Sequence, residues 1–293
     1  MSKAATPGAL VVVGTPIGNL EDMTPRAVRA LREADLVAAE DTRTTRKLFA
    51  RFDLHTPLVS FHRHNLRQRL PKLLEEIRNG KTVAVVSDAG MPGISDPGEE
   101  IVHACLAAGL PVAAVPGPTA VITALVLSGL PTARFTFLGF LPSPRARRRR
   151  ALREIADRPE TLVLYEAPHR LVNLLEDMVA TLGPERRAAA AAELTKVHER
   201  VIRGTVSELL ARFRAVEERG EFTLVVEGAT GSSLPAPEPA AEDAVAHALR
   251  LVAEGMSVRD AVREAAGEGV SRRELYARVL AARAEQATSP PGE

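Results

Sequence analysis

Three loops rich in glycine and proline carry the residues of this chain that are best suited to hold a ligand. They are Gly14–Asn19, Ser87–Gly98 and Pro116–Thr119, and each follows a short apolar run that predicts a β-strand. Glycine has no Cβ, so the backbone of such a loop can approach a ligand closely. In α/β sheets, ligands bind just outside the carboxyl ends of the strands. We therefore expect the three loops to line one cleft, although any one of them alone could be a simple tight turn.

Thr119 stands at the start of a predicted helix, directly after a Pro-Gly-Pro turn. Free amides at a helix start, together with a threonine hydroxyl, stabilise an anionic group such as a carboxylate. The same threonine could equally be a plain N-cap that satisfies its own helix. The residues alone leave both roles open.

Several common catalytic motifs are absent. No G-x-G-x-x-G follows the first predicted strand, and the sequence contains no G-x-x-x-x-G-K-[ST], H-E-x-x-H or G-x-S-x-G. This argues against dinucleotide, P-loop, zinc protease and serine hydrolase chemistry. His62 and His64 could share a strand face, but no third ligand is close in sequence, so we expect no metal site.

Length and composition indicate a folded protein of more than one domain. The chain has 293 residues, of which 45% are hydrophobic and 26% charged, close to the average for globular proteins. Cys105 is the only cysteine, which favours a reducing, cytoplasmic compartment. The first apolar run is too short for a signal peptide or a membrane span, so we expect no membrane partner. The net charge of +1 means that any site for a polyanion must be a local patch.

Short apolar runs alternate with helix-like stretches over most of the chain, the pattern of an α/β fold with a mostly parallel sheet. In the first half, strands are predicted at Leu10–Val13, Leu36–Ala39, Thr82–Val86 and Pro111–Val115, and helices at Pro25–Glu33, Arg67–Asn79, Gly98–Ala108 and Ala120–Leu127. A second series predicts strands at Phe135–Phe140, Thr161–Tyr165, Ala188–Glu193, Val201–Arg203 and Phe222–Glu227, and helices at Arg145–Ala156, Leu171–Thr181 and Val206–Glu218.

A small helical module is predicted at the C-terminal end. Ser257 with Asp260, and Ser271 with Glu274, have the spacing of capping boxes. With a helix over Glu242–Glu254 they predict a three-helix unit that resembles a helix-turn-helix. Its acidic and basic residues nearly cancel, so nucleic-acid contact there is not favoured. The expected boundaries are a disordered N-terminus at 1–8, an N-terminal α/β domain at 9–117, a second α/β domain at 118–230, a Pro-rich linker at 231–241, the helical module at 242–287 and a disordered tail at 288–293.

Eight strings in the sequence together carry a specific family resemblance. They are VVVGTPIGNLEDMTPRA, AAEDTRTTRKL, VSDAGMPGISDPG, VPGPTAVITAL, FLGFLP, YEAPHRL, ELTKVHE and RGTVSELL. In this order and spacing they resemble the tetrapyrrole (corrin/porphyrin) methylase superfamily, in its branch of small-subunit ribosomal RNA 2′-O-methyltransferases that modify a cytidine ribose. The resemblance runs from about Leu10 to Gly228, and the helical module resembles the extension that those enzymes carry.

The resemblance implies a homodimer of two-domain subunits that bind S-adenosylmethionine in a deep cleft between the domains. By position in the family motifs, the cofactor should meet Pro16, Ile17, Gly18, Gly90, Met91, Pro92, Ile94, Thr119, Ala120, Leu164 and Tyr165, with further contributions near Glu193–Lys196 and Thr223–Leu224. Porphyrin-modifying relatives have a glycine-aspartate-proline where this chain reads Gly90-Met91-Pro92. Backbone groups or the nearby Asp88 must therefore replace the missing aspartate.

Methyl transfer to a ribose hydroxyl, a poor nucleophile, calls for a general base or for a cation that stabilises the forming alkoxide. The candidates within the family motifs are Glu40, Asp41, Asp88, Glu166, His169 and Lys196. Lys196 is our first choice because lysine is rare in this arginine-rich chain and an ammonium can lose its proton when desolvated. Glu166, next to Tyr165, is the second choice, followed by Asp88. Glu40 and Asp41 could instead cap a helix that begins near Thr42, and His169 could hydrogen-bond a loop.

Two basic clusters and one loop are candidates for contact with the substrate. Arg43, Arg46 and Lys47 have helical spacing, and a second cluster consists of Arg145, Arg147, Arg148, Arg149, Arg150 and Arg153. The first cluster is expected on one face of a helix, at the mouth of the cleft. For the second cluster a solvated helix face would explain the charge run, but we favour RNA contact through a flexible segment that orders on binding. Ser95 and Asp96 could contact either substrate.

The sequence thus predicts an S-adenosylmethionine-dependent 2′-O-methyltransferase that acts on ribosomal RNA or the small ribosomal subunit. Methylation of a tetrapyrrole precursor is the alternative within enzymes, but the arginine cluster and the altered motif argue against it. A catalytically silent RNA-binding assembly factor is a third interpretation. The cofactor loops argue against it, because a silent protein would gain nothing from them.

Overall fold

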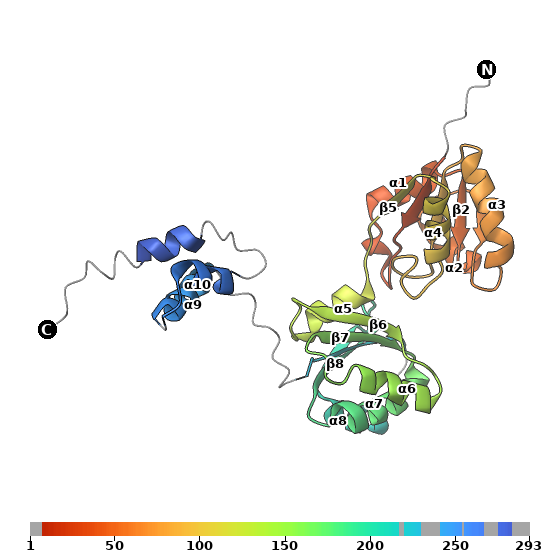
Figure 1. The fold of residues 1–293 in the computed structure, drawn as a ribbon. Helices are drawn as coiled ribbons and strands as arrows, with labels where there is room; N and C mark the ends of the chain where they lie inside the picture. The colour runs from red at the N-terminus through yellow and green to blue at the C-terminus, as the bar shows by residue number, and fades with distance from the viewer. Residues whose placement is uncertain (1–7, 217–219, 230–240, 254, 267–274, 283–293) are drawn as a thin grey trace, which may run out of the picture. The chain divides into compact units, whose positions relative to one another are not determined.

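The computed structural model describes residues 8–216, 220–229, 241–253, 255–266 and 275–282. The chain forms two compact units that divide after residue 229 (Figure 1). The first unit holds two five-stranded sheets with their helices, and the described part of the second unit is helical. This is the α/β architecture with an added helical module that the sequence predicts.

The first sheet is parallel throughout, with strand order β3-β2-β4-β1-β5. Its strands are β1 (Leu10–Val13), β2 (Leu36–Ala39), β3 (Leu58–Ser60), β4 (Val83–Val86) and β5 (Val112–Val115). The chain runs from β1 outward through β2 to β3, returns to β4 and then crosses to β5. The direction of winding therefore reverses between β1 and β4, and in such sheets ligands bind at this point.

Helices cover both faces of the first sheet because its strands are apolar on both faces. In β4, Ala84 and Val86 pack in one cluster with α1 (Pro25–Glu33) and α2 (Thr42–Phe52). Val83 and Val85 point the other way, toward α3 (Leu66–Arg78) and α4 (Glu99–Ala107). A strand buried on both faces reads as a continuous apolar run, which is why the sequence locates it well. The edge strand β3 was not predicted, because it is only three residues long.

The second sheet is mixed, in strand order β6-β7-β10-β8-β9. Its strands are β6 (Phe135–Phe140), β7 (Thr161–Glu166), β8 (Arg187–Ala192), β9 (Arg200–Thr205) and β10 (Phe222–Val226). Only β6 and β7 pair in parallel, and the other three pairs are antiparallel. The expectation of a mostly parallel sheet is therefore wrong for this half. The link from β8 to β9 is too short for the crossover that a parallel pair requires.

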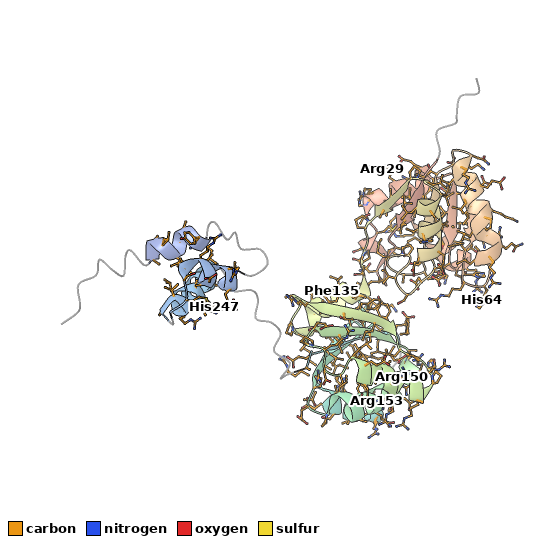
Figure 2. All side chains as sticks on the ribbon, viewed as in Figure 1. Arg29, His64, Phe135, Arg150, Arg153 and His247 are labelled. Atoms are coloured by element: carbon orange, nitrogen blue, oxygen red, sulfur yellow. The ribbon has the colours of Figure 1, made fainter. Side chains whose placement is uncertain are left out.

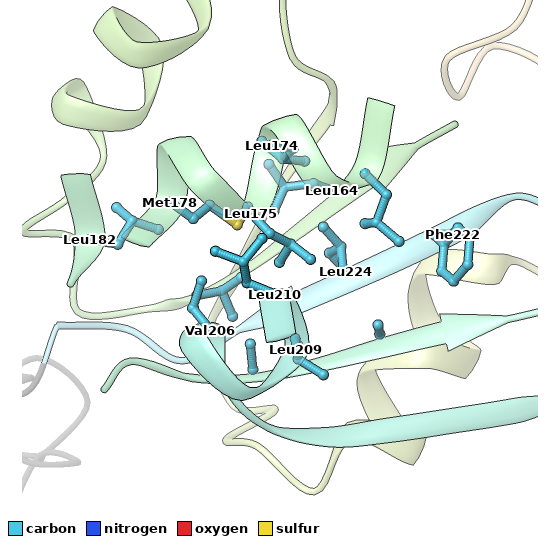
Figure 3. Packing of buried hydrophobic residues seen from close by; sticks show 14 of the residues in the cluster. Leu164, Leu174, Leu175, Met178, Leu182, Val206, Leu209, Leu210, Phe222 and Leu224 are labelled. Atoms are coloured by element: carbon cyan, nitrogen blue, oxygen red, sulfur yellow. The ribbon is translucent and has the colours of Figure 1, made fainter. Parts of the chain in front are cut away.

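The helices α6 (Arg145–Glu154), α7 (Pro168–Leu182) and α8 (Val206–Ala215) lie on one face of the second sheet. Figure 3 shows Leu164 and Leu224 of the sheet packed with leucines of α7 and α8. The other face holds α5 (Ala120–Ser128), against which Val163, Ala191 and Val225 pack. Alternate residues of each strand thus serve opposite faces.

In the second unit, α9 (Ala241–Ala253), α10 (Val258–Ala265) and the helical residues 275–282 share a small apolar core. Ser257 caps α10 by accepting a hydrogen bond from the amide of Asp260, which is one half of the predicted capping box. The Asp260 carboxylate accepts from the Ser257 hydroxyl at 2.6 Å and not from the Ser257 amide. The other predicted capping pair, Ser271 with Glu274, lies outside the described residues, as do most of the predicted linker and the predicted disordered tail.

At the N-terminal end, Gly8 is buried and donates a hydrogen bond to the carbonyl of Ile77, so the expected disorder does not extend to residue 8. Residues 1–7 lie outside the described part. None of the described helices combines the length and the apolar character that crossing a membrane requires.

Candidate functional site

A cleft of about 280 Å³ opens where strands of both sheets end. From the first sheet its wall comes from the segments that follow β1, β2, β4 and β5, and from the second sheet it comes from β6, β7, the turn after β8 and the start of β10. The lining residues are Ile17, Glu40, Asp88, Ala89, Gly90, Met91, Ile94, Ser95, Asp96, Thr119, Ala120, Phe140, Tyr165, Glu193, Leu194, Lys196, Glu221, Phe222 and Thr223.

Backbone contacts hold the three predicted loops together at this cleft. Thr15 and Gly90 exchange two main-chain hydrogen bonds of 2.9 and 3.1 Å, which join the loop after β1 to the loop after β4. The third loop lies against the first: a Cβ on Gly14 would be 2.7 Å from the Cα of Gly117. Such an approach requires glycine on both sides. The three loops therefore line one cleft, as expected from the sequence.

Most of the residues that the resemblance assigns to the cofactor line the cleft. They are Ile17, Gly90, Met91, Ile94, Thr119, Ala120 and Tyr165. Pro16, Gly18 and Pro92 stand beside lining residues without contributing to the wall themselves. Leu164 is fully buried on the face of the second sheet that α7 and α8 cover (Figure 3), so its side chain cannot meet a ligand in the cleft. The strand alternation that sends Tyr165 into the cleft sends Leu164 away from it.

Thr119 is the N-cap of α5, and its hydroxyl accepts a long hydrogen bond of 3.4 Å from the amide of Ile122. The hydroxyl of Tyr165 bonds the main chain of Val121 in the same turn. Burial, followed by the charge of Asp96, raises the pKa of Tyr165 to about 12. The start of α5 thus faces the cleft while Thr119 caps it, so the two roles that the sequence left open are compatible.

Carboxylates form one wall of the cleft. The amide of Asp88 donates to Glu40 Oε2 at 3.3 Å, and the amide of Asp41 donates to Asp88 Oδ1 at 3.2 Å. These bonds link the ends of β2 and β4. Burial is the main cause that raises the pKa of both Glu40 and Asp88. Glu40 therefore belongs to the cleft and does not cap a helix.

Asp41 has the capping role that the sequence offered as the ordinary explanation. Its carboxylate accepts from the amide of Arg43 at 2.7 Å, at the start of α2, and forms an ion pair with the Arg43 guanidinium. This side-chain hydrogen bond is the main cause that lowers the pKa of Asp41 to about 2. Arg43 is paired with Asp41 but its side chain is 84% exposed, and Arg46 and Lys47 are exposed as well, so all three members of this basic cluster remain candidates for contact with RNA.

Lys196 reaches the cleft from the turn after β8, paired with Glu193. Its Nζ lies 3.0 Å from Glu193 Oε1. Glu193 and Thr195 both adopt left-handed backbone conformations, with φ of 53° and 65°. Residues other than glycine are rarely found there, and such strain gathers at functional sites. The turn is thus fixed in a conformation that brings Lys196 to the cleft.

Glu166, the second choice for the general base, is placed elsewhere. Its side chain is fully buried, accepts a 2.9 Å hydrogen bond from the amide of Ala167 and pairs with Arg170 at 3.1 Å. Burial raises its pKa. Neither Glu166 nor the exposed His169 lines the cleft. Successive side chains of a strand point to opposite faces, so Glu166 points to the same face as Leu164 and away from Tyr165. The order of residues along β7 does not reveal which face lines the cleft.

The arginine cluster forms the regular helix α6, not a flexible segment. Arg148 is buried and pairs with the fully buried Asp177 at 2.7 Å, while Arg145 and Arg149 approach the same carboxylate at 3.1 and 3.8 Å. The expectation that Arg148 contacts RNA is therefore wrong. Arg147, Arg150 and Arg153 are exposed, and Figure 2 marks the last two on the helical side of the second sheet.

His62 and His64 lie in a turn after β3, with ring centroids 5.9 Å apart, and not on a strand. Among the described residues, no group of three or more His, Cys, Asp or Glu side chains is placed to hold a metal ion. Sequence reasoning missed Phe140 and Glu221 as lining residues. The only signal for Phe140 was its place in the string FLGFLP, and Glu221 carried none.

The chain matches two known families in succession. Residues 9–210 match the tetrapyrrole (corrin/porphyrin) methylases, and residues 238–283 match the RsmI C-terminal HTH domain. The second match agrees with the helix-turn-helix resemblance of the C-terminal module.

Curated relatives match nearly the whole chain. Ribosomal RNA small subunit methyltransferase I from Synechocystis sp. (strain PCC 6803) is 47% identical over 92% of this chain and 96% of its own length. The protein of the same name from Bacillus subtilis (strain 168) is 43% identical over 92% and 93%. That from Mycobacterium tuberculosis (strain H37Rv) is 46% identical over 95% and 96%.

Solved structures share the fold of the first unit. Uroporphyrin-III C-methyltransferase from Thermus thermophilus has a TM-score of 0.52 and 26% identity, and covers 74% of this chain and 94% of its own. Diphthine synthase has a TM-score of 0.58 at 17% identity, over 76% of this chain and 90% of its own, and shows the fold alone. The family match covers residues 9–210, and relatives are more than 40% identical over most of the chain. The cleft also lies beside the loops that follow β1 and β4, where the winding of the first sheet reverses. The chain therefore belongs to the tetrapyrrole (corrin/porphyrin) methylase family.

Proposed function

We propose that this protein transfers a methyl group from S-adenosylmethionine to the ribose 2′-oxygen of a cytidine in small-subunit ribosomal RNA. The observation that carries the proposal is the kinship at 43–47% identity, over more than nine tenths of the chain, with proteins named ribosomal RNA small subunit methyltransferase I. The cleft supports it, since its walls match the chemistry of the cofactor.

The lining residues fit S-adenosylmethionine in charge and polarity. When bound, this cofactor supplies an electrophilic methyl group on a sulfonium. Glu40 and Asp88 place negative charge where a sulfonium cation would be stabilised. The start of α5 at Thr119 offers amides to the methionyl carboxylate. Ile17 and Met91 supply apolar surface for the adenine ring.

Lys196 serves best as a cation. An ammonium that is paired with a carboxylate donates hydrogen bonds and accepts none. At the edge of the cleft it is suited to stabilise the alkoxide character that develops on the attacking oxygen. This replaces the sequence-based proposal that Lys196 is the base.

Transfer of labelled methyl tests the function. Purified protein would be incubated with labelled S-adenosylmethionine and, separately, with small ribosomal subunits, naked ribosomal RNA and a porphyrinogen. We expect label in RNA, at one position that resists alkaline cleavage, because a 2′-O-methyl group blocks attack by that oxygen. Label in the porphyrinogen alone would favour the tetrapyrrole alternative. Binding of RNA without any transfer would favour a silent assembly factor.

Replacing Thr119 with leucine should weaken cofactor binding at least tenfold, because a branched apolar side chain would enter the wall at the helix start and remove the hydroxyl. Loss of the N-cap should cost only about 1 kcal/mol of stability. Isothermal titration with S-adenosylmethionine measures the first effect and thermal unfolding the second. Thr119→Ser, which keeps the hydroxyl, is the matched control and should bind almost normally. A folded leucine variant with unchanged affinity would contradict the placement of the cofactor.

We further propose that the exposed face of α6 contacts the RNA backbone. Arg147→Ala with Arg150→Ala should weaken RNA binding and lower the salt slope by about one for each phosphate that is no longer neutralised. Fluorescence anisotropy across a salt series measures both. Arg26→Ala with Arg29→Ala removes the same charge from the exposed face of α1 (Figure 2 marks Arg29) and should change the slope much less. If both pairs of substitutions changed RNA binding equally, the arginines of α6 would act only through the overall charge of the protein and not through a specific contact.

A homodimer in the cytoplasm completes the proposal. Ile122 and Val126 on α5 are 47% and 66% exposed, which is the kind of apolar surface that a second subunit covers. The cytoplasmic location follows from the proposed ribosomal RNA substrate. The boundaries of the two α/β domains, 9–117 and 118–230, are likewise part of the proposal.

A further inference from the structure

The loop from Gly93 to Gly98 has a fixed conformation at the mouth of the cleft. Gly93, Ser95 and Gly98 have φ of 85°, 67° and 151°, so three of its six residues adopt backbone conformations that L side chains rarely do. Its two ends also touch, since a Cβ on Gly98 would be 2.7 Å from the Gly93 nitrogen. Left-handed serine is strained, and such strain persists only where surrounding contacts enforce it.

Two contacts hold Ser95 in place. Its carbonyl accepts a 3.0 Å hydrogen bond from Arg63 Nη2, which comes from the turn after β3. Its hydroxyl lies against Gly139 of the second sheet, where a Cβ would stand 3.1 Å from Ser95 Oγ. Gly139 has φ of 61° and sits in the irregular part of β6. Asp96, the next residue, is therefore positioned by both sheets.

Asp96 differs from the other carboxylates of the same wall in its hydrogen-bond partner. Glu40 and Asp88 each accept a main-chain amide, and Glu193 is paired with Lys196. The Asp96 carboxylate has the side chain of Ser87 as its hydrogen-bond partner, and the Ser87 hydroxyl also lies 3.3 Å from the carbonyl oxygen of Ala89. This hydrogen bond favours the ionised carboxylate, so it lowers the pKa of Asp96 and acts against the effect of burial.

The surroundings of Asp96 favour a carboxyl group that takes up a proton. Burial is the largest cause, and the charges of Glu40, Asp88 and Glu221 add to it, so that the pKa of Asp96 is raised to about 7. Tyr165 faces it from β7, and its own pKa is raised partly by the Asp96 charge. Arg63 approaches through the Ser95 carbonyl. A base whose pKa lies near the working pH is the most effective in proton transfer.

We propose that Asp96 is the general base of the methyl transfer, an inference that rests on the proposed function. The 2′-hydroxyl oxygen forms its new bond to the methyl carbon while the carbon–sulfur bond breaks, with its electron pair going to sulfur. The hydroxyl proton goes to a carboxylate oxygen of Asp96 and is later released to water. The products are the 2′-O-methyl ribose and S-adenosylhomocysteine, so that atoms and charge balance.

The pH dependence follows with a definite sign. Asp96 accepts a proton only when it is ionised, so the rate should rise with pH and level off above a pKa of about 7. The positive sulfonium stabilises the ionised carboxylate. The rise in kcat should therefore lie at lower pH than the rise in kcat/KM for the cofactor, which reports the free enzyme.

The test compares full-length wild-type protein with Asp96→Asn, an isosteric variant that cannot accept the proton. We expect single-turnover transfer to RNA to fall about 10²- to 10⁴-fold and the pH-dependent rise near 7 to vanish. Affinity for S-adenosylmethionine, measured by titration calorimetry, should stay within about threefold, since two other carboxylates face the same space. Glu99→Gln, which removes an exposed carboxylate three residues later, is the matched control and should keep the wild-type rate and profile.

Three results would overturn the inference. The first is an Asp96→Asn variant with the wild-type rate. The second is a variant that loses cofactor affinity but keeps its rate at saturation, which would make Asp96 a cofactor ligand. The third applies if Asp96→Asn does not fold normally: it is an Asp96→Glu variant that folds and shows the wild-type pH profile. A wild-type protein that labels no ribose would instead refute the proposed function, and with it the role of Asp96, so the two failures are distinguishable.

Discussion

Replacing Asp177 with alanine is expected to lower the free energy of unfolding by about 3–5 kcal/mol, a large part of the stability of a domain. Asp177 is fully buried under α6 and holds three arginines. Its partner Arg148 has a side chain only 5% exposed. Without the carboxylate, that guanidinium would stay buried with main-chain carbonyls of Ser143 and Asn173 as its partners. An uncompensated buried charge costs far more than the absence of one ion pair at the surface.

Urea unfolding followed by circular dichroism would measure this effect. Asp157→Ala is the matched control, because Asp157 lies outside this buried cluster and its removal should change stability by less than about 0.5 kcal/mol. The double variant Asp177→Leu with Arg148→Met removes both charges and should recover most of the loss. Equal stability of the Asp177→Ala and Asp157→Ala variants would show that solvent reaches Arg148. In that case Arg148 would again be a candidate for contact with RNA, as the sequence predicted.

Replacing Gly18 with valine is expected to reduce methyl transfer by about 10²-fold or more. A Cβ on Gly18 would lie 2.7 Å from Lys196 Cγ and 2.8 Å from both the Leu194 carbonyl oxygen and Thr195 Oγ1. The lysine side chain can move, but the main chain at Leu194 cannot yield without displacing the strained turn after β8. That turn carries Lys196 to the cleft, so its displacement should lower kcat in particular.

Gly109 provides the contrast for this substitution. A Cβ on Gly109 meets nothing within 4 Å, but its φ of 67° makes a side chain unfavourable there. Gly109→Ala should therefore lose about 1–2 kcal/mol of stability and keep normal turnover. Gly18→Val should lose turnover by more than its stability explains. If the two variants differed only in stability, the contact between Gly18 and the Lys196 turn would have no part in the reaction.

Corrections to the sequence-based site follow from one geometric fact, which is that a side chain points to one face of its element only. Glu166 and Leu164 lie on a strand that also supplies Tyr165 to the cleft, but alternate residues point away from it. Arg148 belongs to a helix that also carries exposed arginines, yet it faces α7. In each case the motif was found at the right place in the chain. The direction of the side chain depends on packing partners that lie far away in the sequence.

The sequence by itself determined the order of elements, most of the first-sheet strands and the ligand loops. β1, β2, α1 and β6 begin and end where the patterns predict, because local propensities, caps and apolar runs set these limits. Glycine and proline mark the loops after β1, β4 and β5 for the same local reason. The family resemblance added the cofactor and the acceptor, which periodicity could not supply.

Tertiary structure alone decided the antiparallel pairing of β8, β9 and β10, the burial of Arg148 with Asp177, and the position of Asp96 between the two sheets. Each of these depends on contacts between segments that are distant in sequence, such as Arg63 with Ser95 and Ser95 with Gly139. Desolvation, which sets the proton affinity of Asp96, depends on everything packed around it. A local pattern contains no record of those neighbours, and they exist only once the chain has folded.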